Sequence, residues 1–206
     1  MTIEIKKSKK PIDYMKAMSL LEKRMLKIHE KKENELIWIL KHPNVFTGGT
    51  SYQKNEILDK SIKILKTNRG GKITYHGPGQ IIIYFVLDLK KRNNNIRKLI
   101  LIIEKTIIET LKSYNIDSFS DRKNIGIWVN HEDKIKKIAA IGIKVKKWIA
   151  YHGFSINIDT NLNNFEKIIP CGIKDKEVSN LKVIKKQDYS EIGDLIVEKF
   201  IKYLET

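Results

Sequence analysis

The only cysteine of this chain sits in a setting suited to nucleophilic chemistry. Cys171 lies between a proline and a glycine in "IIPCGI", at the end of an apolar approach. The proline restricts the backbone before the thiol, and the glycine leaves the next backbone N–H accessible beside the sulfur. A free thiol ionises near pH ~8.5, and a neighbouring cation lowers that pKa. We therefore predict a reactive thiolate at Cys171; the alternative is a buried, inert thiol.

A lysine that enters an apolar run is the best cation for this thiol. Lys137 directly precedes Ile138 in "KIAAIGI", so burial of the run would draw its ammonium out of bulk solvent. Lys144, further along the same segment, is the competing choice. Lys146 and Lys147 follow it in a pattern typical of a solvated strand edge. Residue types alone favour Lys137 without excluding Lys144.

A glycine-rich stretch, "RGGKITYHGPGQ" at 69–80, predicts a loop that contacts a ligand. Gly70 and Gly71 allow successive backbone N–H groups to face a bound group, and Arg69 supplies positive charge. The turn at 77–79 would hold His76 at the end of a strand. The alternative is an ordinary hairpin whose histidine is satisfied by its neighbours.

A second Tyr-His-Gly sequence occurs at 151–153 in "YHGFSINI". Taken alone, His152 is more typical of a packed core histidine than of a functional one. Its similarity to the segment around His76 suggests that two strands present histidines to one cleft.

Three helices are predicted around these segments. The first covers 11–32, with Pro11 in its first turn and a buried stripe of Met15, Met18, Leu21, Met25 and Ile28. The second covers 94–116, with Asn95 as N-cap and a buried stripe of Ile96, Ile100, Ile103, Ile107 and Leu111. The third covers 190–204 near the end of the chain.

Apolar and β-branched runs predict the strands, which are expected at 35–43, 61–68, 71–76, 80–89, 124–130, 137–145 and 148–159. "HEDK" would turn the chain between the strands at 124–130 and 137–145. Helices separated by groups of strands indicate an α+β domain with a mixed or mostly antiparallel sheet. Neither a dinucleotide-binding fingerprint nor a Walker A motif is present.

The composition is typical of a globular protein, and one domain is expected over residues 1–206. Hydrophobic residues make up 41% and charged residues 31% of the chain. No apolar run approaches the ~18 residues of a membrane span, and residues 1–14 lack the apolar core of a secretory signal. One cysteine excludes an internal disulfide and any CxxC metal or redox motif. A cytoplasmic monomer without metal or membrane contact is expected.

The formal charge of +16 does not by itself indicate nucleic-acid binding. The basic residues are almost all lysines dispersed along the chain, whereas base readout favours arginine. Lysine, isoleucine and asparagine enrichment together are typical of A/T-rich coding. Any macromolecular partners are expected to be acidic proteins and not nucleic acids.

The segments "RGGKITYHGPGQIIIY", "KIAAIG", "YHGFSINI" and "PCGI" together resemble the octanoyltransferase family of lipoate biosynthesis. The resemblance covers residues 45–178 and includes the lysine–cysteine pair. It implies an α+β fold shared with lipoate and biotin protein ligases, built from a larger mixed sheet and a smaller sheet flanked by helices. It also implies octanoyl transfer from acyl carrier protein to a lysine of a lipoyl domain or glycine-cleavage H protein, without a cofactor.

The resemblance assigns roles residue by residue. Cys171 corresponds to the acyl-thioester nucleophile and Lys137 to the lysine that lowers its pKa, while His76 and His152 line the cleft. The residues that correspond to substrate-binding segments are Arg69, Gly70, Gly71, Lys72, Ile73, Thr74, Tyr75, His76, Ala140, Ile141, Gly142, Gly153, Phe154 and Ser155. Backbone N–H groups near Gly142 and after Cys171 are candidate oxyanion donors, and Gly70, Gly71 and Gly153 are expected to leave room for the acyl chain.

Four other functions remain as alternatives. An ATP-dependent lipoate or biotin ligase would share the fold but need no cysteine nucleophile. An amidotransferase would move octanoyl between lipoyl domains. A nucleic-acid-binding module is suggested by charge alone, and an inactive relative is disfavoured by the intact Lys137 and Cys171.

Overall fold

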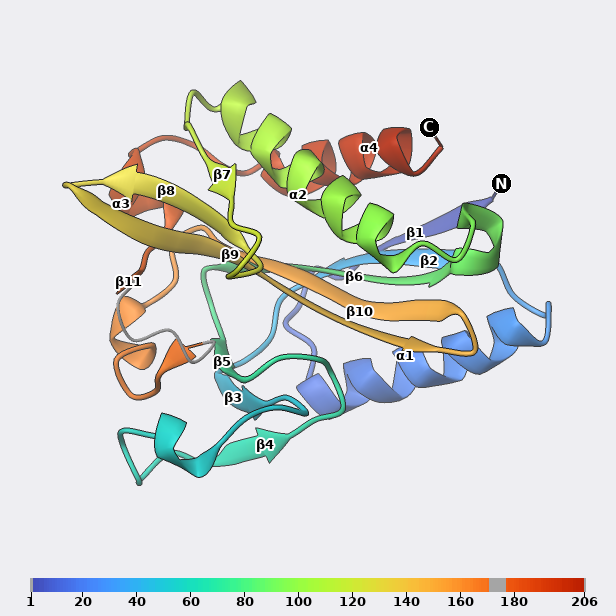
Figure 1. Ribbon diagram of the computed structural model, residues 1–206, viewed down its shortest axis with the longest axis horizontal. Helices are drawn as coiled ribbons and strands as arrows, with labels where there is room; N and C mark the ends of the chain where they lie inside the picture. Colours follow the sequence, from blue (N-terminus) through green and yellow to red (C-terminus); the bar gives the residue numbers. More distant parts are fainter. Residues whose placement is uncertain (1, 171–176, 206) are drawn as a thin grey trace.

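The computed structural model describes residues 2–170 and 177–205, which form two sheets and flanking helices (Figure 1). The helices are α1 (Tyr14–His29), α2 (Ile96–Ser113), α3 (Leu181–Ile184) and α4 (Ile192–Leu204), with short 3-10 turns η1 (Lys54–Glu56), η2 (Leu89–Arg92) and η3 (Leu162–Asn164). The strands are β1 (Ile3–Lys7), β2 (Glu35–Leu40), β3 (Val45–Gly48), β4 (Ile64–Lys66), β5 (Ile73–His76), β6 (Gln80–Asp88), β7 (Phe119–Ser120), β8 (Ile127–His131), β9 (Lys134–Lys146), β10 (Ile149–Asn157) and β11 (Glu177–Val178). Within the described ranges, no helix is long and apolar enough to cross a bilayer.

The larger sheet has the strand order β1-β2-β6-β10-β9-β8-β7, with β11 added beside β9. β1 lies parallel to β2 and β11 parallel to β9, while the other neighbours are antiparallel. The smaller sheet has the order β4-β3-β5. The expected α+β class with a larger mixed sheet and a smaller one is therefore confirmed.

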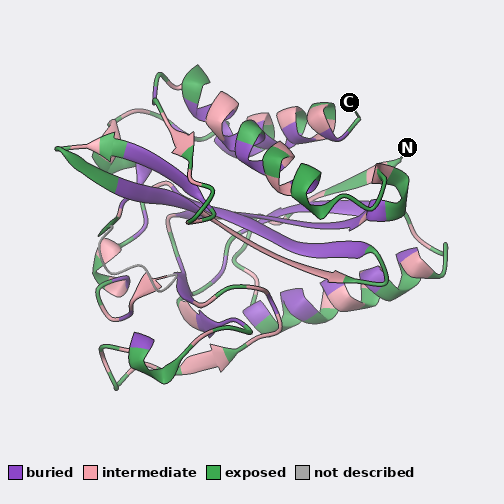
Figure 2. Cartoon of the chain, viewed as in Figure 1, coloured by how far each residue is buried: buried purple, intermediate pink, exposed green. Residues whose placement is uncertain are grey.

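Helices cover both faces of the larger sheet and bury its central strands. In Figure 1, α2 and α4 lie over one face and α1 lies across the other. Figure 2 shows the same division, with buried strands in the middle and exposed outer helix surfaces. β2 is buried along its whole length, as expected for a short apolar run between layers.

The predicted second helix is confirmed in its cap and corrected in its buried stripe. The side chain of Asn95 accepts a hydrogen bond from the backbone N–H of Lys98, which satisfies one free donor of the first turn. Ile103, Ile107 and Leu111 are buried, but Ile96 is 37% exposed and Ile100 is only half-buried. The prediction was wrong at Ile96 and Ile100 because these two side chains line a cavity, while Leu99 packs into the core in their place.

The first helix begins later than the sequence predicts. Asp13 caps it by accepting a hydrogen bond from the backbone N–H of Lys16, so Pro11 precedes the first turn instead of lying in it. Most of the predicted stripe is buried, but Met15 is 54% exposed. The stripe is shifted because Tyr14 and Ala17 occupy the positions that face the sheet.

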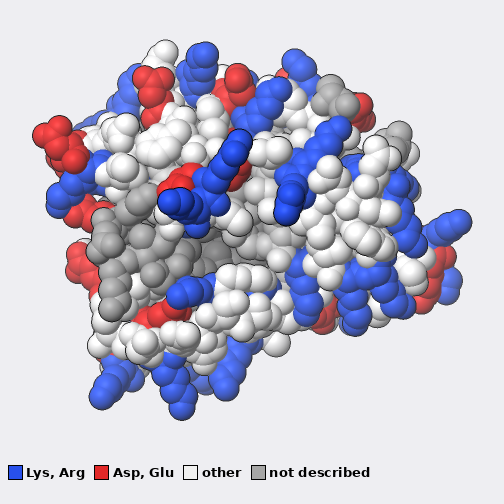
Figure 3. All heavy atoms as spheres, viewed as in Figure 1, with Lys and Arg blue, Asp and Glu red and all other residues white. Residues whose placement is uncertain are grey.

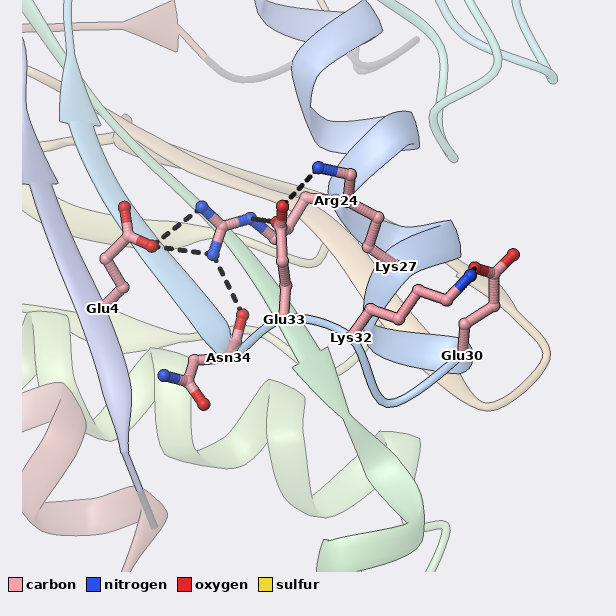
Figure 4. A network of polar contacts seen from close by, with 7 residues as sticks. All are labelled: Glu4, Arg24, Lys27, Glu30, Lys32, Glu33 and Asn34. Atoms are coloured by element: carbon pink, nitrogen blue, oxygen red, sulfur yellow. Dashed lines mark hydrogen bonds and ion pairs between the residues drawn. The ribbon is translucent and has the colours of Figure 1, made fainter.

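Arg24 joins α1 to the edge of the larger sheet (Figure 4). Its guanidinium contacts the Glu4 carboxylate on β1 at 2.8 Å and the Glu33 carboxylate at 2.6 Å. It also donates to the backbone carbonyl of Asn34 at 3.0 Å, directly before β2. One side chain thus connects three consecutive elements, β1, α1 and β2.

The sequence did not predict β1 or β3. β1 is short and rich in lysine, and its two isoleucines give little apolar signal. β3 is four residues long and ends at Gly48. Both strands depend on pairing with neighbours that are distant in sequence, which local propensity does not encode.

Candidate active site

A cavity of about 620 Å³ opens between the β9–β10 pair, the loop before β5 and the start of α2. It gathers segments that are far apart in the sequence. The predicted site residues that line it are Arg69, Gly70, Gly71, Lys72, Ile73, Thr74, His76, Lys137, Ala140, Ile141, Gly142, His152, Gly153, Phe154 and Ser155. The register of the sheet explains part of this grouping, since Gly153 pairs with Gly142 and Ser155 pairs with Ala140.

Among the described residues, one predicted site residue, Tyr75, is not among those that line the cavity. Tyr75 turns into the core of the smaller sheet, where its hydroxyl lies 2.6 Å from the Oδ1 of Asn44 and its ring packs edge-on against Phe165. Its neighbours in β5 point the other way because side chains alternate along a strand. Cys171 lies outside the described residues.

Lys137 is buried in the wall of the cavity and fixed by several contacts. Only 6% of the residue is exposed. Its ammonium donates to the backbone carbonyl of Ile125 at 2.9 Å and lies 5.0 Å from the centre of the Trp128 ring. A Cβ built at Gly126 would lie 2.3 Å from the Cε of Lys137, so only glycine leaves room for this side chain.

Residues on both sides of the segment 171–176 lie beside Lys137: Pro170 before it and Val178 after it. Pro170 lines a small cavity of about 20 Å³ together with Lys137 and Ser155. On the other side, Val178 of β11 pairs with Lys137 in the sheet, and the next backbone N–H, of Ser179, donates to the Lys137 carbonyl at 2.9 Å. Lys144, the competing lysine, does not line either cavity.

Arg69 is a buried cation held by neutral groups. It is 8% exposed, and its guanidinium donates to the carbonyl and hydroxyl of Thr47, each at 2.9 Å, and to the carbonyl of Gly70 at 3.0 Å. No carboxylate among the described residues forms an ion pair with it, and its Nε has no hydrogen-bond partner there. The cavity thus contains a buried positive charge with an unused donor.

Tyr84, the last residue of the motif at 69–84, lines the cavity and is hydrogen-bonded to His42, a buried residue that sequence analysis did not single out. His42 faces the carbonyl of Ile12 at 2.6 Å through Nδ1, which must therefore carry the proton. Burial lowers the pKa of His42, so its Nε2 stays an acceptor for the Tyr84 hydroxyl at 2.9 Å. Burial also raises the pKa of Tyr84 well above its ordinary value, which keeps the phenol protonated.

His76 is held by an amide chain. Its Nδ1 lies 2.7 Å from the Oε1 of Gln80, whose amide donates to the Oδ1 of Asn157 at 2.8 Å. Burial, with a smaller effect from neighbouring His42, lowers the pKa of His76 to about 3. His76 is therefore a neutral, oriented wall of the cavity at physiological pH.

The ring of His152 is oriented by a hydrogen-bonded chain that runs through Asn68 to α1. Its Nε2 lies 3.0 Å from the Oδ1 of Asn68, and the Asn68 amide donates to the Glu22 carboxylate of α1 at 2.5 Å. Burial, followed by the charges of Arg69 and Lys144, lowers the pKa of His152 to about 3.

The backbone of His152 is left-handed, with φ at 75°, which is costly for a residue other than glycine. Consecutive side chains of a regular strand point to opposite faces, yet the rings of Tyr151 and His152 stack at 5.0 Å. The unusual φ therefore accompanies a change in the side on which His152 presents its ring. Strained residues of this kind cluster at functional sites.

Gly70 and Gly153 were expected to leave room for an acyl chain, but both allow backbone segments of the protein to pack closely. A Cβ at Gly153 would lie 1.9 Å from the Ile83 carbonyl oxygen of β6, so its missing side chain admits a neighbouring strand and not an acyl chain. A Cβ at Gly70 would lie 2.9 Å from the Ile143 carbonyl oxygen, so this residue admits the loop to β9. Gly71, with φ at 86°, is the glycine of this set that has no such clash.

The outer part of the cavity is apolar and carries basic groups. Ile96 and Ile100 of α2 contribute to it together with Ile125. Lys72 pairs with the buried Glu56 carboxylate at 2.8 Å, and Lys123 also lines the cavity. Lys and Arg side chains are spread over the face of the molecule in Figure 3.

Acid is expected to destabilise this fold before the carboxylates titrate. His76 and His152 are neutral when folded, with pKa values of about 3, and take up protons on unfolding once the pH is below about 6.5. The free energy of unfolding should therefore fall between pH 6.5 and 3, by about 2 kcal/mol for each histidine from pH 7 to pH 5. Denaturant titrations at both pH values measure this. A His76→Gln variant should lose about half of the dependence, and stability that stays constant over this range would contradict it.

The residues missed by sequence analysis act through partners distant in sequence. Asn68 immediately precedes the glycine-rich stretch, and Glu22 lies on the polar side of a predicted helix, so neither carries a local signal. His42 lies at the end of a predicted apolar strand, next to a proline. A titratable residue at that position could have been taken as a sign of a functional site. Ile96 and Ile100 were assigned to the core because helical spacing does not distinguish core from cavity.

Comparison with known proteins places the chain among lipoylation enzymes. The model of the lipoyl protein ligase A/B catalytic domain matches residues 13–204. An octanoyltransferase of Ehrlichia chaffeensis is 43% identical over 201 residues, covering 96% of this chain and 94% of that protein. An octanoyltransferase of the Wolbachia strain wMel is 43% identical over 193 residues, covering 93% of this chain and 94% of that protein. The fold matches Plasmodium falciparum LipL1 in complex with lipoate, with a TM-score of 0.73 and 19% identity over 99% of this chain and 63% of that one.

Proposed function

The chain belongs to the lipoyl protein ligase A/B catalytic domain family and is an octanoyltransferase, and we propose that it works through a covalent thioester. In this proposal the octanoyl group comes from an acyl carrier protein thioester and is held on Cys171. It then passes to a specific lysine of a lipoyl domain or of glycine-cleavage H protein.

The position of Lys137 is the observation that carries this proposal. It is a buried lysine at the wall of the cavity, and Pro170 and Val178 approach it from either side of the segment 171–176. Cys171 directly follows Pro170 in the chain, and in this proposal its thiol lies beside this ammonium group. A cation beside a thiol favours the thiolate, which is the nucleophilic form.

In the first half-reaction, the Cys171 thiolate attacks the carbonyl carbon of the donor thioester. A new carbon–sulfur bond forms at Cys171, and the bond to the donor sulfur breaks. The proton released by Cys171 is carried by Lys137 and returns to the donor as its thiol leaves. Exchange of one thioester for another is nearly balanced in free energy, so no ATP is required.

In the second half-reaction, the amine of the acceptor lysine attacks the acyl-Cys171 carbonyl. A carbon–nitrogen bond forms, the carbon–sulfur bond breaks, and Lys137 moves a proton from the amine to the departing Cys171 sulfur. Amide formation from a thioester is downhill. Backbone N–H groups near Gly142 and after Cys171 are the proposed donors to the tetrahedral oxyanion.

The surface charge favours acidic protein partners. The chain carries a formal charge of +16, and Lys72 and Lys123 lie at the cavity itself. Opposite charges on the donor and acceptor domains would raise the rate of encounter, in a manner that salt weakens. We place this reaction in the cytoplasm, carried out by the chain acting as one catalytic domain.

The experiment that tests this function uses two donors and one acceptor. Purified protein is incubated with a lipoyl domain and either octanoyl-acyl carrier protein or free octanoate plus ATP, and the acceptor is weighed by mass spectrometry. Octanoylation from the carrier protein without ATP is expected. Product formed only from octanoate and ATP would contradict the proposal and favour a ligase. Faster transfer from an octanoylated lipoyl domain in a competition assay would favour an amidotransferase.

A further inference from the structure

Two residues that line the cavity, Arg69 and His152, each carry a buried polar atom that the reaction does not use. His152 is 1% exposed, and its Nδ1 has no hydrogen-bond partner among the described residues. The Nε of Arg69 also has no hydrogen-bond partner among the described residues. The positive charge of Arg69 contributes to the lowered pKa of His152. Buried polar groups without partners are uncommon, and those that line a cavity mark a place for a ligand group.

The hydrogen-bonding role of each atom is set by its surroundings. The ionised Glu22 carboxylate can only accept, so the Asn68 amide must donate to it and present its oxygen to His152. The Nε2 of His152 therefore carries the proton, which leaves Nδ1 as an acceptor. The guanidinium of Arg69 can only donate. These two lining side chains thus have one unused acceptor and one unused donor.

The spacing along β10 places these atoms at the far end of an eight-carbon chain. Ser155 lies at the reacting end, because it shares the small cavity with Lys137 and Pro170. From Ser155 to His152 an antiparallel strand covers about 10 Å. An extended octanoyl group measures about 9 Å from its carbonyl carbon to its methyl, from ordinary bond lengths and angles.

We propose that this end of the cavity recognises a hydroxyl group at the tail of an eight-carbon acyl chain, with His152 as the residue that sets the preference. This inference rests on the proposed function. A hydroxyl both donates and accepts, so it complements the His152 acceptor and the Arg69 donor together, whereas a methyl group satisfies neither. The enzyme therefore transfers 8-hydroxyoctanoyl groups in addition to octanoyl groups, and His152 limits the chain to this length.

The test compares pantetheine thioesters of octanoate, 8-hydroxyoctanoate and decanoate as donors to a lipoyl domain. The variants are His152→Asn, which tolerates the left-handed backbone, and Asn68→Leu, which removes the group that orients His152. Asn163→Leu on exposed η3 is the matched control, and thermal unfolding verifies that each variant is folded.

The wild-type enzyme should use the hydroxy chain with a kcat/KM within a few-fold of octanoyl or above it. In His152→Asn the ratio of hydroxy to octanoyl kcat/KM should fall about tenfold, the size of one lost hydrogen bond, and decanoyl transfer should rise. Asn68→Leu should lower the ratio in the same direction, and Asn163→Leu should leave it unchanged. A purely structural role for His152 would lower both rates equally.

Two results would overturn this inference while leaving the proposed function intact. One is octanoyl transfer with more than a hundredfold discrimination against the hydroxy chain, as an apolar channel would give. The other is a ratio that is unchanged in both His152→Asn and Asn68→Leu, which would mean that solvent alone occupies these atoms. Absence of octanoyl transfer by the wild-type enzyme would instead reject the proposed function, and this inference with it.

Discussion

Replacing Lys137 with methionine is expected to lower the rate of octanoyl transfer by a factor of about 10² to 10⁴. Methionine keeps most of the volume of the buried side chain but removes the ammonium that donates to the Ile125 carbonyl. Without that group the Cys171 thiol loses its neighbouring cation, and neither half-reaction has a carrier for its proton. Steady-state transfer from octanoyl-acyl carrier protein measures the loss, with circular dichroism to verify folding.

Lys144→Met is the matched control, because it removes a lysine from the same strand that does not line the cavity. Its rate should stay within about twofold of the wild-type enzyme, as is usual for surface substitutions. Equal losses in Lys137→Met and Lys144→Met would show that general positive charge matters and not the position of Lys137. A large loss in Lys144→Met alone would transfer the proposed role to the competing lysine.

Replacing Cys171 with serine is expected to reduce transfer by about a thousandfold or more, since a hydroxyl gives up its proton far less readily than a thiol and is a far weaker nucleophile than a thiolate. The variant should still bind the donor, because the residues that line the cavity are unchanged. Binding of octanoyl-acyl carrier protein, measured by calorimetry, should therefore survive while turnover does not.

Three other outcomes of the Cys171→Ser experiment have distinct meanings. An ATP-dependent ligase would retain most of its activity and require ATP, because an adenylate needs no enzyme thiol. Loss of both binding and turnover would indicate damage to the fold and would be visible as a lower unfolding temperature. Retained turnover with the thioester donor would reject a covalent intermediate at this residue.

Local patterns in the sequence predicted the elements that depend on local physics. Apolar spacing identified the three longer helices, α1, α2 and α4, but not the four-residue α3, and Asn95 caps α2 as expected. The strands around His76 and His152 were found because β-branched runs bounded by glycine carry a strong signal. The α+β class followed from the order of these elements.

The remaining features depend on contacts between distant segments. The exposure of Ile96 follows from a cavity beside α2, which helical spacing does not reveal. The link from Glu22 through Asn68 to His152 joins α1, a loop and β10, so no local pattern contains it. Gly153 was expected to admit a ligand, and only the pairing of β10 with β6 shows that it admits a carbonyl group.

The burial of Lys137 was predicted from the sequence, but the contacts that fix it were not. Its position before an apolar run indicated burial, and the structure has it 6% exposed. Its fixation by the Ile125 carbonyl and by the space at Gly126 was not foreseeable, because the loop before β8 and β9 meet only in the folded sheet. The role of Cys171 remains a prediction.

The central claim, a covalent octanoyl group on Cys171, is tested most directly by the mass of the enzyme after mixing with octanoyl-acyl carrier protein in the absence of acceptor. We predict a gain of ~126 Da, the mass of an octanoyl group replacing a thiol hydrogen in nucleophilic catalysis. Peptide mapping should place it on the fragment that contains Cys171, and addition of a lipoyl domain should remove it. An enzyme that transfers octanoyl to the acceptor under the same conditions but never shows this added mass would contradict the account.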